Sequence, residues 1–312
     1  MKHVYLSIIL LLPLIGFSCQ TQKQKTQFTG TKFESPELVR VPDIPSSITV
    51  SDERAVFLVN HYWDRFDFAD YDLLQRSEIT EQAFVDYINI LNYVPNVISS
   101  QSLKNMLKNI ESNKIAYTHF VELYEKYLYD PKSPFLNEKY YISVLEEVID
   151  SPVLNESSKS RYQFQLDLAK KNRIGQIAND FIYTLSSGEE GTLHGINSRY
   201  IILMFIDPGC RTCAEVIDVL SSSVKIDNAL AKNTFSHKEL SILTIYPDTD
   251  LDEWRNSLPN MPSSWINAYD KELKITNDTI FDLKSIPTLY LLDKDKKVVL
   301  KDAKVEQIID FF

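Results

Sequence analysis

The stretch FIDPGCRTC, residues 205–213, places Cys210 and Cys213 three positions apart, directly after the apolar run YIILMF. Cysteines at this spacing occur in redox centres, in metal sites and in structural disulfides. Three features of the sequence distinguish these interpretations: the total number of cysteines, the N-terminal residues, and the pattern of strands and helices around the pair.

The composition is that of a globular protein. The chain has 312 residues, enough for two domains that each bury a core of their own. Its formal net charge is −10, so we expect no nucleic-acid partner, which needs a concentrated basic face. Only 7 residues are glycine, and neither G-x-G-x-x-G nor G-x-x-x-x-G-K-[ST] is present, so no phosphate-binding loop is expected.

The first residues have the pattern of an export signal. Lys2 precedes the apolar run VYLSIILLLPLIGF, which is too short to cross a membrane as a mature helix. The run ends in IGFSC, with the small residue Ser18 just before Cys19. This arrangement resembles a lipoprotein signal, which implies that residues 1–18 are removed and that Cys19 carries the lipid. The alternative is an ordinary secretory signal with a chance cysteine.

A polar segment follows the predicted signal peptide. Residues 19–47 begin with QTQKQKTQ after Cys19 and have no helical periodicity at the start, so we interpret them as a flexible tether. A lipid on Cys19 holds the protein to a bacterial membrane while the folded domains stay in water outside the cytoplasm. No acidic run follows Cys19, which favours the periplasmic side over the cell surface.

The number of cysteines narrows the role of the pair. The chain has 3 cysteines, so Cys210 and Cys213 alone remain if Cys19 is lipidated. One pair cannot form a disulfide framework. A structural zinc site normally needs four ligands, and none of the 5 histidines has ligand spacing near the pair, so no metal is expected.

Residues 48–172 have the periodicity of helices. Apolar residues recur at intervals of three and four, as Phe84, Tyr87, Ile88 and Leu91 do after Thr80, a candidate N-cap. Five helices are expected, over residues 52–68, 80–94, 116–130, 140–149 and 160–171. No strand pattern occurs, so we predict an all-α domain with its tyrosines and phenylalanines in the core.

Residues 173–312 have a different pattern. Short apolar runs predict strands over residues 180–185, 200–206, 239–247, 288–293 and 297–302. Helical segments lie between and after them, over residues 213–224, 250–258 and 305–312. This alternation predicts an α/β domain with a mixed central sheet flanked by helices. The whole chain is therefore expected to be a two-domain α+β protein.

The cysteine pair lies where a buried strand ends and a helix begins. The N-terminus of a helix carries a partial positive charge and free N–H groups, and both favour a thiolate over a thiol. We therefore expect Cys210 to be an exposed nucleophile with a lowered pKa. Cys213, one turn into the helix, is positioned to attack a mixed disulfide on Cys210. Arg211 adds a positive charge beside the thiolate and the substrate.

The pattern extends beyond the pair. Ile286, Pro287 and the strand TLYLLD follow about 75 residues later. A strand, a C-x-x-C helix and such a proline together resemble the thioredoxin fold, and with GQIANDF they resemble the TlpA/ResA-like branch of lipoproteins in Gram-negative gut-type bacteria. The resemblance covers residues 174–312. It implies a cis bond before Pro287, with Ile286 and Pro287 contacting an extended substrate. The segment HYWDRFDFAD resembles an N-terminal helical domain of unknown function found in such lipoproteins.

The resemblance implies a thiol-disulfide oxidoreductase, more often a reductase. Its partners are protein disulfides or dithiols, and a membrane electron donor or an upstream thioredoxin-type reductant resets the pair. It uses no cofactor besides the redox-active disulfide of Cys210 and Cys213. The C-x-x-C motif does not fix the direction of electron flow. The alternative is a non-catalytic binding lipoprotein in which the thioredoxin-like half is a scaffold and the helical domain recruits a partner.

Three positions depart from the thioredoxin pattern. Gly209 stands where thioredoxins have a tryptophan, and Met204 replaces their buried aspartate. Val216 stands where related reductases have a glutamate. The residue that accepts the proton of Cys213 is therefore not assigned by the resemblance.

Two acidic side chains near the pair are candidate proton acceptors for Cys213. Asp207 precedes the first cysteine and Glu215 follows the second, and solvent water is the third candidate. Asp207 also bears on another activity, because peroxiredoxins need threonine or serine three residues before their reactive cysteine. This chain has Asp207 there, which argues against a peroxidase.

Overall fold

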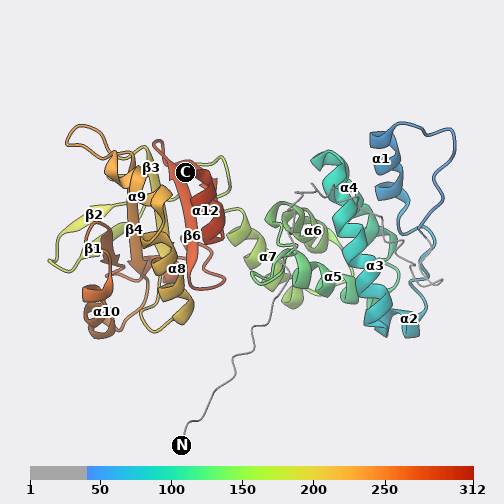
Figure 1. Cartoon of the computed structure of the whole chain (residues 1–312). Helices are drawn as coiled ribbons and strands as arrows, with labels where there is room; N and C mark the ends of the chain where they lie inside the picture. The colour runs from blue at the N-terminus through green and yellow to red at the C-terminus, as the bar shows by residue number, and fades with distance from the viewer. Residues whose placement is uncertain (1–40) are drawn as a thin grey trace, which may run out of the picture. The chain divides into compact units, whose positions relative to one another are not determined.

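The N-terminal part of the chain is helical. The computed structural model describes residues 41–312, and from residue 41 to 172 it contains helices and no strand (Figure 1). They are α1 (Ser51–His61), α2 (Tyr71–Gln75), α3 (Ser77–Ile90), the 3-10 helix η1 (Leu91–Tyr93), α4 (Asn96–Asn109), α5 (Lys114–Leu128), α6 (Glu138–Asp150) and α7 (Glu156–Ala169). The predicted all-α domain is confirmed. The predicted signal peptide and Cys19 lie outside the described residues.

Two helices of this domain, α2 and α4, were not predicted, and the start of α3 was wrong. Ser99 and Ser102 occupy buried positions of α4 that are usually apolar, which hides its periodicity. Their hydroxyls donate to the carbonyls of Leu91 and Val59 at 2.9 and 2.8 Å, so these buried polar groups are satisfied. Thr80 is not an N-cap, since α3 begins at Ser77; its hydroxyl donates to a carbonyl of α2.

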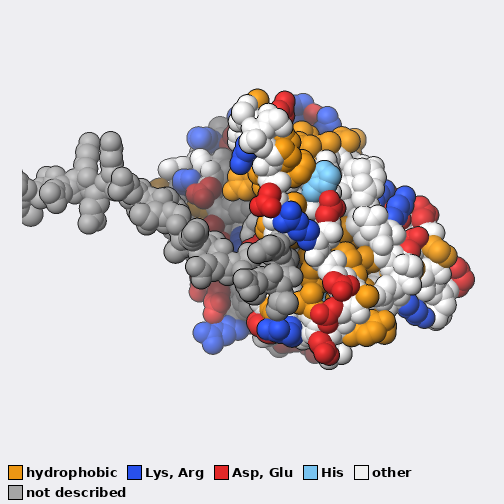
Figure 2. Space-filling model, turned by 90° about the vertical axis from the view of Figure 1, so that its right-hand side faces the viewer, with side chains coloured by type: hydrophobic (Ala, Val, Ile, Leu, Met, Phe, Trp, Pro, Cys, Tyr) orange, Lys and Arg blue, Asp and Glu red, His pale blue; other side chains and the backbone are white. Residues whose placement is uncertain are grey.

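Aromatic side chains form the centre of the helical domain. Tyr87, Tyr117, Phe120 and Tyr124 are completely buried. The ring of Trp63 meets that of Phe120 edge-on, with 5.2 Å between centroids, an arrangement that aromatic pairs favour. The prediction that tyrosines and phenylalanines form the core is confirmed for these residues, whereas Tyr71, Tyr93 and Phe164 are exposed. Figure 2 shows the outer face of this domain, where acidic and basic side chains are mixed with apolar ones.

The C-terminal part is a mixed sheet flanked by helices, as predicted (Figure 1). The strands are β1 (Ile182–Leu185), β2 (Glu190–Thr192), β3 (Tyr200–Phe205), β4 (Leu240–Tyr246), β5 (Ile266–Tyr269), β6 (Thr288–Asp293) and β7 (Val298–Leu300), and their order is β2-β1-β5-β4-β3-β6-β7. The helices are α8 (Arg211–Ser221), α9 (Val224–Ala231), α10 (Leu251–Ser257), the 3-10 helix η2 (Leu258–Asn260), α11 (Lys274–Asn277) and α12 (Val305–Phe311).

The central strand β3 is covered on both faces. It runs parallel to β4 and antiparallel to β6. Its alternate residues belong to two different hydrophobic clusters: Leu203 and Phe205 to one, Ile202 and Met204 to the other. Because both faces are apolar, the strand reads as one continuous hydrophobic run, and the cysteine pair follows directly at its carboxyl end.

Hydrogen bonds, as well as the chain itself, connect the helical domain to the C-terminal domain. The described residues belong to one compact unit, residues 36–312. After α7, the Lys171 ammonium donates to the carbonyl of Thr279 at 2.8 Å, and the Asn172 amide donates to that of Ile280 at 2.8 Å. None of the helices in residues 41–312 is long and apolar enough to cross a membrane.

Candidate active site

A tight turn between β3 and α8 places Cys210 at the start of the helix. The Asp207 carboxylate accepts the Gly209 N–H at 2.8 Å, and the Asp207 carbonyl accepts the Cys210 N–H at 3.1 Å. Aspartate favours such turns because its side chain can bond the backbone two residues on. Cys210 is the N-cap residue of α8, with an extended backbone. Its side chain therefore lies at the positive end of the helix.

Within residues 41–312, the Cys210 sulfur takes part in two hydrogen bonds. It accepts a hydrogen bond from the N–H of Cys213 at 3.3 Å, and it lies 3.6 Å from the carbonyl oxygen of Ile286, to which the thiol donates. The N–H contact and the helix dipole both stabilise negative charge on this sulfur. The side chain is half-buried, so a partner sulfur can reach it.

Cys213 has a different environment. Only 2% of it is exposed, and it packs in the same hydrophobic cluster as Met204. Burial raises the pKa of the Cys213 thiol to about 12. The backbone N–H of Asp207 opposes this shift, while the nearby Cys210 and the Asp207 carboxylate add to it. Cys213 is therefore a protonated, inaccessible thiol at neutral pH.

The loop before β6 lies against the first cysteine. We call residues 284–287 the proline loop. The Ile286–Pro287 peptide bond is cis, as the resemblance implied. The hydroxyl of Thr288, the first residue of β6, donates to the carbonyl of Ser285 in the loop. The N–H of Ile286 has no hydrogen-bond partner within residues 41–312, so this backbone group is free to pair with an incoming strand.

The charged residues predicted around the pair occupy different places. Arg211 and Glu215 form an ion pair of 2.9 Å on the surface of α8, with 92% and 58% of their side chains exposed. Glu215 thus faces solvent and Arg211, whereas the Cys213 sulfur is buried. Asp207 is close enough to act on the pKa of Cys213, but its carboxylate bonds the Gly209 N–H. No carboxylate of residues 41–312 hydrogen-bonds the Cys213 sulfur.

A further acidic side chain next to the pair was not predicted. A Cβ atom added to Gly209 would lie 3.0 Å from the carboxylate oxygen of Glu253, in the first turn of α10. The tryptophan that thioredoxins carry at this position would therefore meet Glu253. Nothing in the local sequence connects Gly209 to α10, because the fold alone brings these segments together.

Buried charges connect the proline loop to the helical domain. We call Glu138, Asp282, Lys284, Lys301 and Asp302 the ionic cluster. Lys284 contacts the carboxylates of Glu138, Asp282 and Asp302 at 3.4, 3.1 and 3.2 Å, and Lys301 contacts Glu138 at 2.7 Å. The two lysine side chains are only 6% and 3% exposed. Burial alone lowers the pKa of Lys284, but the three carboxylates outweigh it and raise that pKa, so Lys284 is charged.

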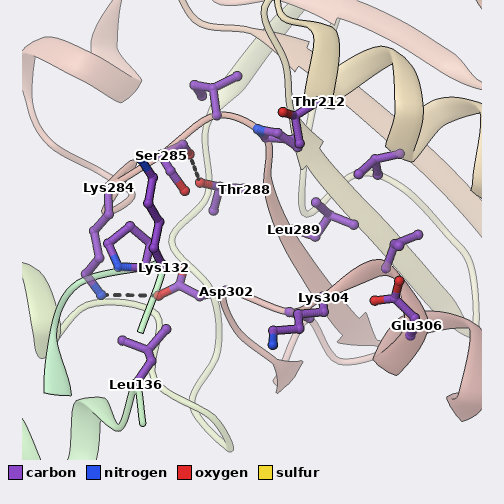
Figure 3. A pocket seen from close by; sticks show the side chains of 16 residues that line it. Lys132, Leu136, Thr212, Lys284, Ser285, Thr288, Leu289, Asp302, Lys304 and Glu306 are labelled. Carbon is purple, nitrogen blue, oxygen red and sulfur yellow. Dashed lines mark hydrogen bonds and ion pairs between the residues drawn. The ribbon is translucent and has the colours of Figure 1, made fainter. Parts of the chain in front are cut away.

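A pocket of about 410 Å³ opens beside the proline loop (Figure 3). One wall comes from the helical domain, through residues 131–136 between α5 and α6. The other walls come from the starts of α8, β6 and α12 and from the proline loop itself. The lining residues are Pro131, Lys132, Leu136, Thr212, Val216, Lys284, Ser285, Ile286, Pro287, Thr288, Leu289, Asp302, Ala303, Lys304, Val305 and Glu306. Sequence reasoning found Ile286 and Pro287 but none of the helical-domain wall.

The comparisons with known proteins divide the chain in the same way. Residues 18–172 match the model of a domain of unknown function (DUF5106), and residues 197–298 match a thioredoxin-like model. Within residues 41–312, no three or more His, Cys, Asp or Glu side chains are arranged to hold a metal ion. No curated protein matches the chain.

Solved structures match one or both parts. A thioredoxin-like protein from Bacteroides caccae ATCC 43185 is 44% identical, with a TM-score of 0.82, over 87% of this chain and 96% of that one. The C-terminal domain of an uncharacterized protein from Bacteroides fragilis NCTC 9343 is 45% identical over 45% of this chain and 96% of its own, with a TM-score of 0.43. The thioredoxin domain of a thiol-disulfide oxidoreductase from Bacteroides vulgatus is 17% identical over 45% of this chain and 97% of its own, with a TM-score of 0.36.

Proposed function

The chain belongs to the family of thioredoxin-like proteins, and we propose that it is a thiol-disulfide oxidoreductase whose reactive groups are Cys210 and Cys213. One observation supports this most: an accessible thiol caps a helix, and a buried thiol lies one turn below it. The N–H of Cys213 donates to the Cys210 sulfur, so the two residues are already in contact. A scaffold without redox activity has no use for this arrangement.

The proposed reaction has two exchange steps. The Cys210 thiolate attacks one sulfur of a substrate disulfide; the substrate S–S bond breaks, and its other sulfur leaves as a thiolate and takes a proton from water. Cys213 then loses its proton and attacks the Cys210 sulfur. This forms the Cys210–Cys213 disulfide and releases the second substrate thiolate. Two electrons pass from the protein to the substrate, and an external dithiol must return them.

The proton of Cys213 goes to water in this scheme. Glu215 is paired with Arg211 on the surface, and Met204 fills the buried position where thioredoxins have an aspartate. Asp207 lies nearby, but its negative charge disfavours the Cys213 thiolate. Loss of this proton is therefore the difficult part of the second step.

We place the reaction outside the cytoplasm and in the reducing direction. Cys19, as the lipidated residue, anchors the protein to the periplasmic side of a membrane, and the tether lets the folded domains reach protein disulfides there. In an oxidising compartment such disulfides form readily, so a dedicated reductase has substrates. A membrane electron donor or a thioredoxin-type reductant resets the pair.

Reduction of insulin disulfides tests the proposal. With dithiothreitol as donor, we expect the wild-type protein to accelerate insulin precipitation and Cys210→Ser to abolish this acceleration, because the attacking thiolate is lost. Without dithiothreitol, Cys213→Ser should form a mixed disulfide on Cys210 that persists, because the resolving thiol is missing. Turnover that is unaffected by Cys210→Ser would reject the oxidoreductase and favour the scaffold alternative.

A further inference from the structure

The pocket beside the proline loop lies next to the reactive cysteine, which does not itself line it. Ile286 contributes to both, since its carbonyl accepts from the Cys210 thiol and its side chain lines the pocket. Thr212, two residues after Cys210, lines the same pocket. A polypeptide that pairs with the backbone of Ile286 while its disulfide meets Cys210 therefore lies beside this opening.

The pocket has the properties of a built binding site. Its volume of about 410 Å³ lies within the range of about 300–1,000 Å³ that is usual for ligand pockets. Apolar residues make up eight of the 16 lining residues, among them Leu136, Val216 and Leu289. The other eight are polar or charged, and they include Lys132, Asp302 and Glu306 (Figure 3). Such a pocket suits an apolar side chain whose backbone stays at the polar rim.

The helical-domain wall is held in place. The hydroxyl of Ser133 donates to the Tyr127 carbonyl at 2.6 Å, and the N–H of Asn137, just after the wall, donates to the Leu128 carbonyl at 3.0 Å. These two bonds tie the segment to the end of α5. Directly after the wall segment, at the start of α6, Glu138 forms an ion pair with Lys284 of the proline loop. An ion pair therefore links the helical domain, next to the wall, to the proline loop that contacts Cys210.

We infer that this pocket selects substrates: it takes an apolar side chain of an extended polypeptide whose cysteine reacts with Cys210. This inference rests on the proposed function. The free N–H of Ile286 pairs with the substrate backbone as a short added strand. In an extended strand, side chains two positions apart point to the same face. The apolar residue therefore lies two positions from the reacting cysteine, and Leu136 of the helical domain contacts it.

Two peptides test the inference on the unaltered protein. Both carry one cysteine in a mixed disulfide with glutathione; one has leucine and the other has serine at both positions two residues from the cysteine. We expect kcat/KM to be at least about tenfold higher for the leucine peptide, the discrimination that an apolar pocket gives a side chain. Equal values for the two peptides would overturn the inference.

A substitution at Leu136 tests whether the helical-domain wall causes the preference for the leucine peptide. Leu136→Asp should reduce the ratio of the two kcat/KM values to about one, because the aspartate places a charge in the apolar wall. Val97→Asp adds the same charge at an exposed position of α4, outside the pocket, and should keep the wild-type ratio. A ratio that stays high in Leu136→Asp would overturn the role of the helical domain. Leu136→Ser, judged by the same ratio, replaces Leu136→Asp if thermal unfolding shows that the latter does not fold.

Oxidised glutathione separates the two proposals, since it has no leucine to enter the pocket. If the protein reduces glutathione and both peptides with equal kcat/KM, the oxidoreductase stands and the inference fails. If it reduces none of the three, the proposed function fails, and the inference fails with it.

Discussion

At the scale of single residues, two cysteines of the same motif have opposite environments. Cys210 is half-buried at a helix N-terminus, and Cys213 is 2% exposed among apolar side chains. Sequence reasoning predicted the order of the two roles from the position of the pair at the end of β3. It could not predict the fate of the Cys213 proton, because that depends on which carboxylates the fold brings to the buried sulfur.

The second exchange step should depend steeply on pH. In the mixed disulfide the Cys210 sulfur carries no charge, so burial and the Asp207 carboxylate keep the pKa of Cys213 high. A thiol whose pKa lies above the working pH gains about tenfold in thiolate for each pH unit, so release should accelerate about tenfold per unit from pH 6 to 9. Stopped-flow measurement of release from a preformed mixed disulfide gives this profile.

Asp207→Asn distinguishes the charge of Asp207 from a role as proton acceptor. Asparagine still accepts the Gly209 N–H, so the turn before Cys210 should survive. If Asp207 only repels the Cys213 thiolate, the variant releases substrate faster than wild type at pH 7. Slower release and a flatter pH profile would show that Asp207 accepts the proton. Glu215→Gln is the matched control, and it should leave the rate close to that of wild type.

At the scale of elements, the strongest patterns were predicted and the weakest were missed. The strands β3, β4 and β6 are buried on both faces and read as apolar runs, and α8 follows a recognisable motif. The missed strands β2 and β5 read EGT and INAY, so β2 has no apolar residue and Asn267 interrupts β5. The ionic cluster was not predicted either, because Glu138 of α6 and Lys284 of the proline loop are far apart in the sequence.

Glu138→Gln should measure what this cluster contributes. The change leaves Lys284 and Lys301 buried with one carboxylate fewer, and breaking a buried ion pair typically costs about 3–5 kcal/mol. We expect the free energy of unfolding, measured in urea, to fall by about 3 kcal/mol. On the same helix, Glu146 pairs with lysines at a more exposed position, with 37% of its side chain accessible, so Glu146→Gln should cost less than about 1 kcal/mol. If both variants lose the same free energy of unfolding, the buried ionic cluster stabilises the protein no more than an exposed ion pair does.

At the scale of the whole molecule, the two domains both contribute to the candidate site. The thioredoxin-like domain supplies both cysteines and the proline loop, and the helical domain supplies a wall of the adjoining pocket through Leu136. Sequence reasoning identified both domains, and their classes are confirmed. Sequence reasoning described the two domains separately, because the periodicity of a segment carries no information about which surfaces of the folded protein meet.

The redox equilibrium of the Cys210–Cys213 pair tests the central claim most directly. The protein is equilibrated in buffers with graded ratios of reduced to oxidised dithiothreitol or glutathione, and free thiols are then trapped by alkylation and counted by mass spectrometry. We predict one two-electron transition between an intramolecular disulfide and two thiols, with a midpoint between about −270 and −120 mV, the span of known thioredoxin-fold proteins. Two thiols that persist across the whole range, or a disulfide that forms only between molecules, would contradict the account.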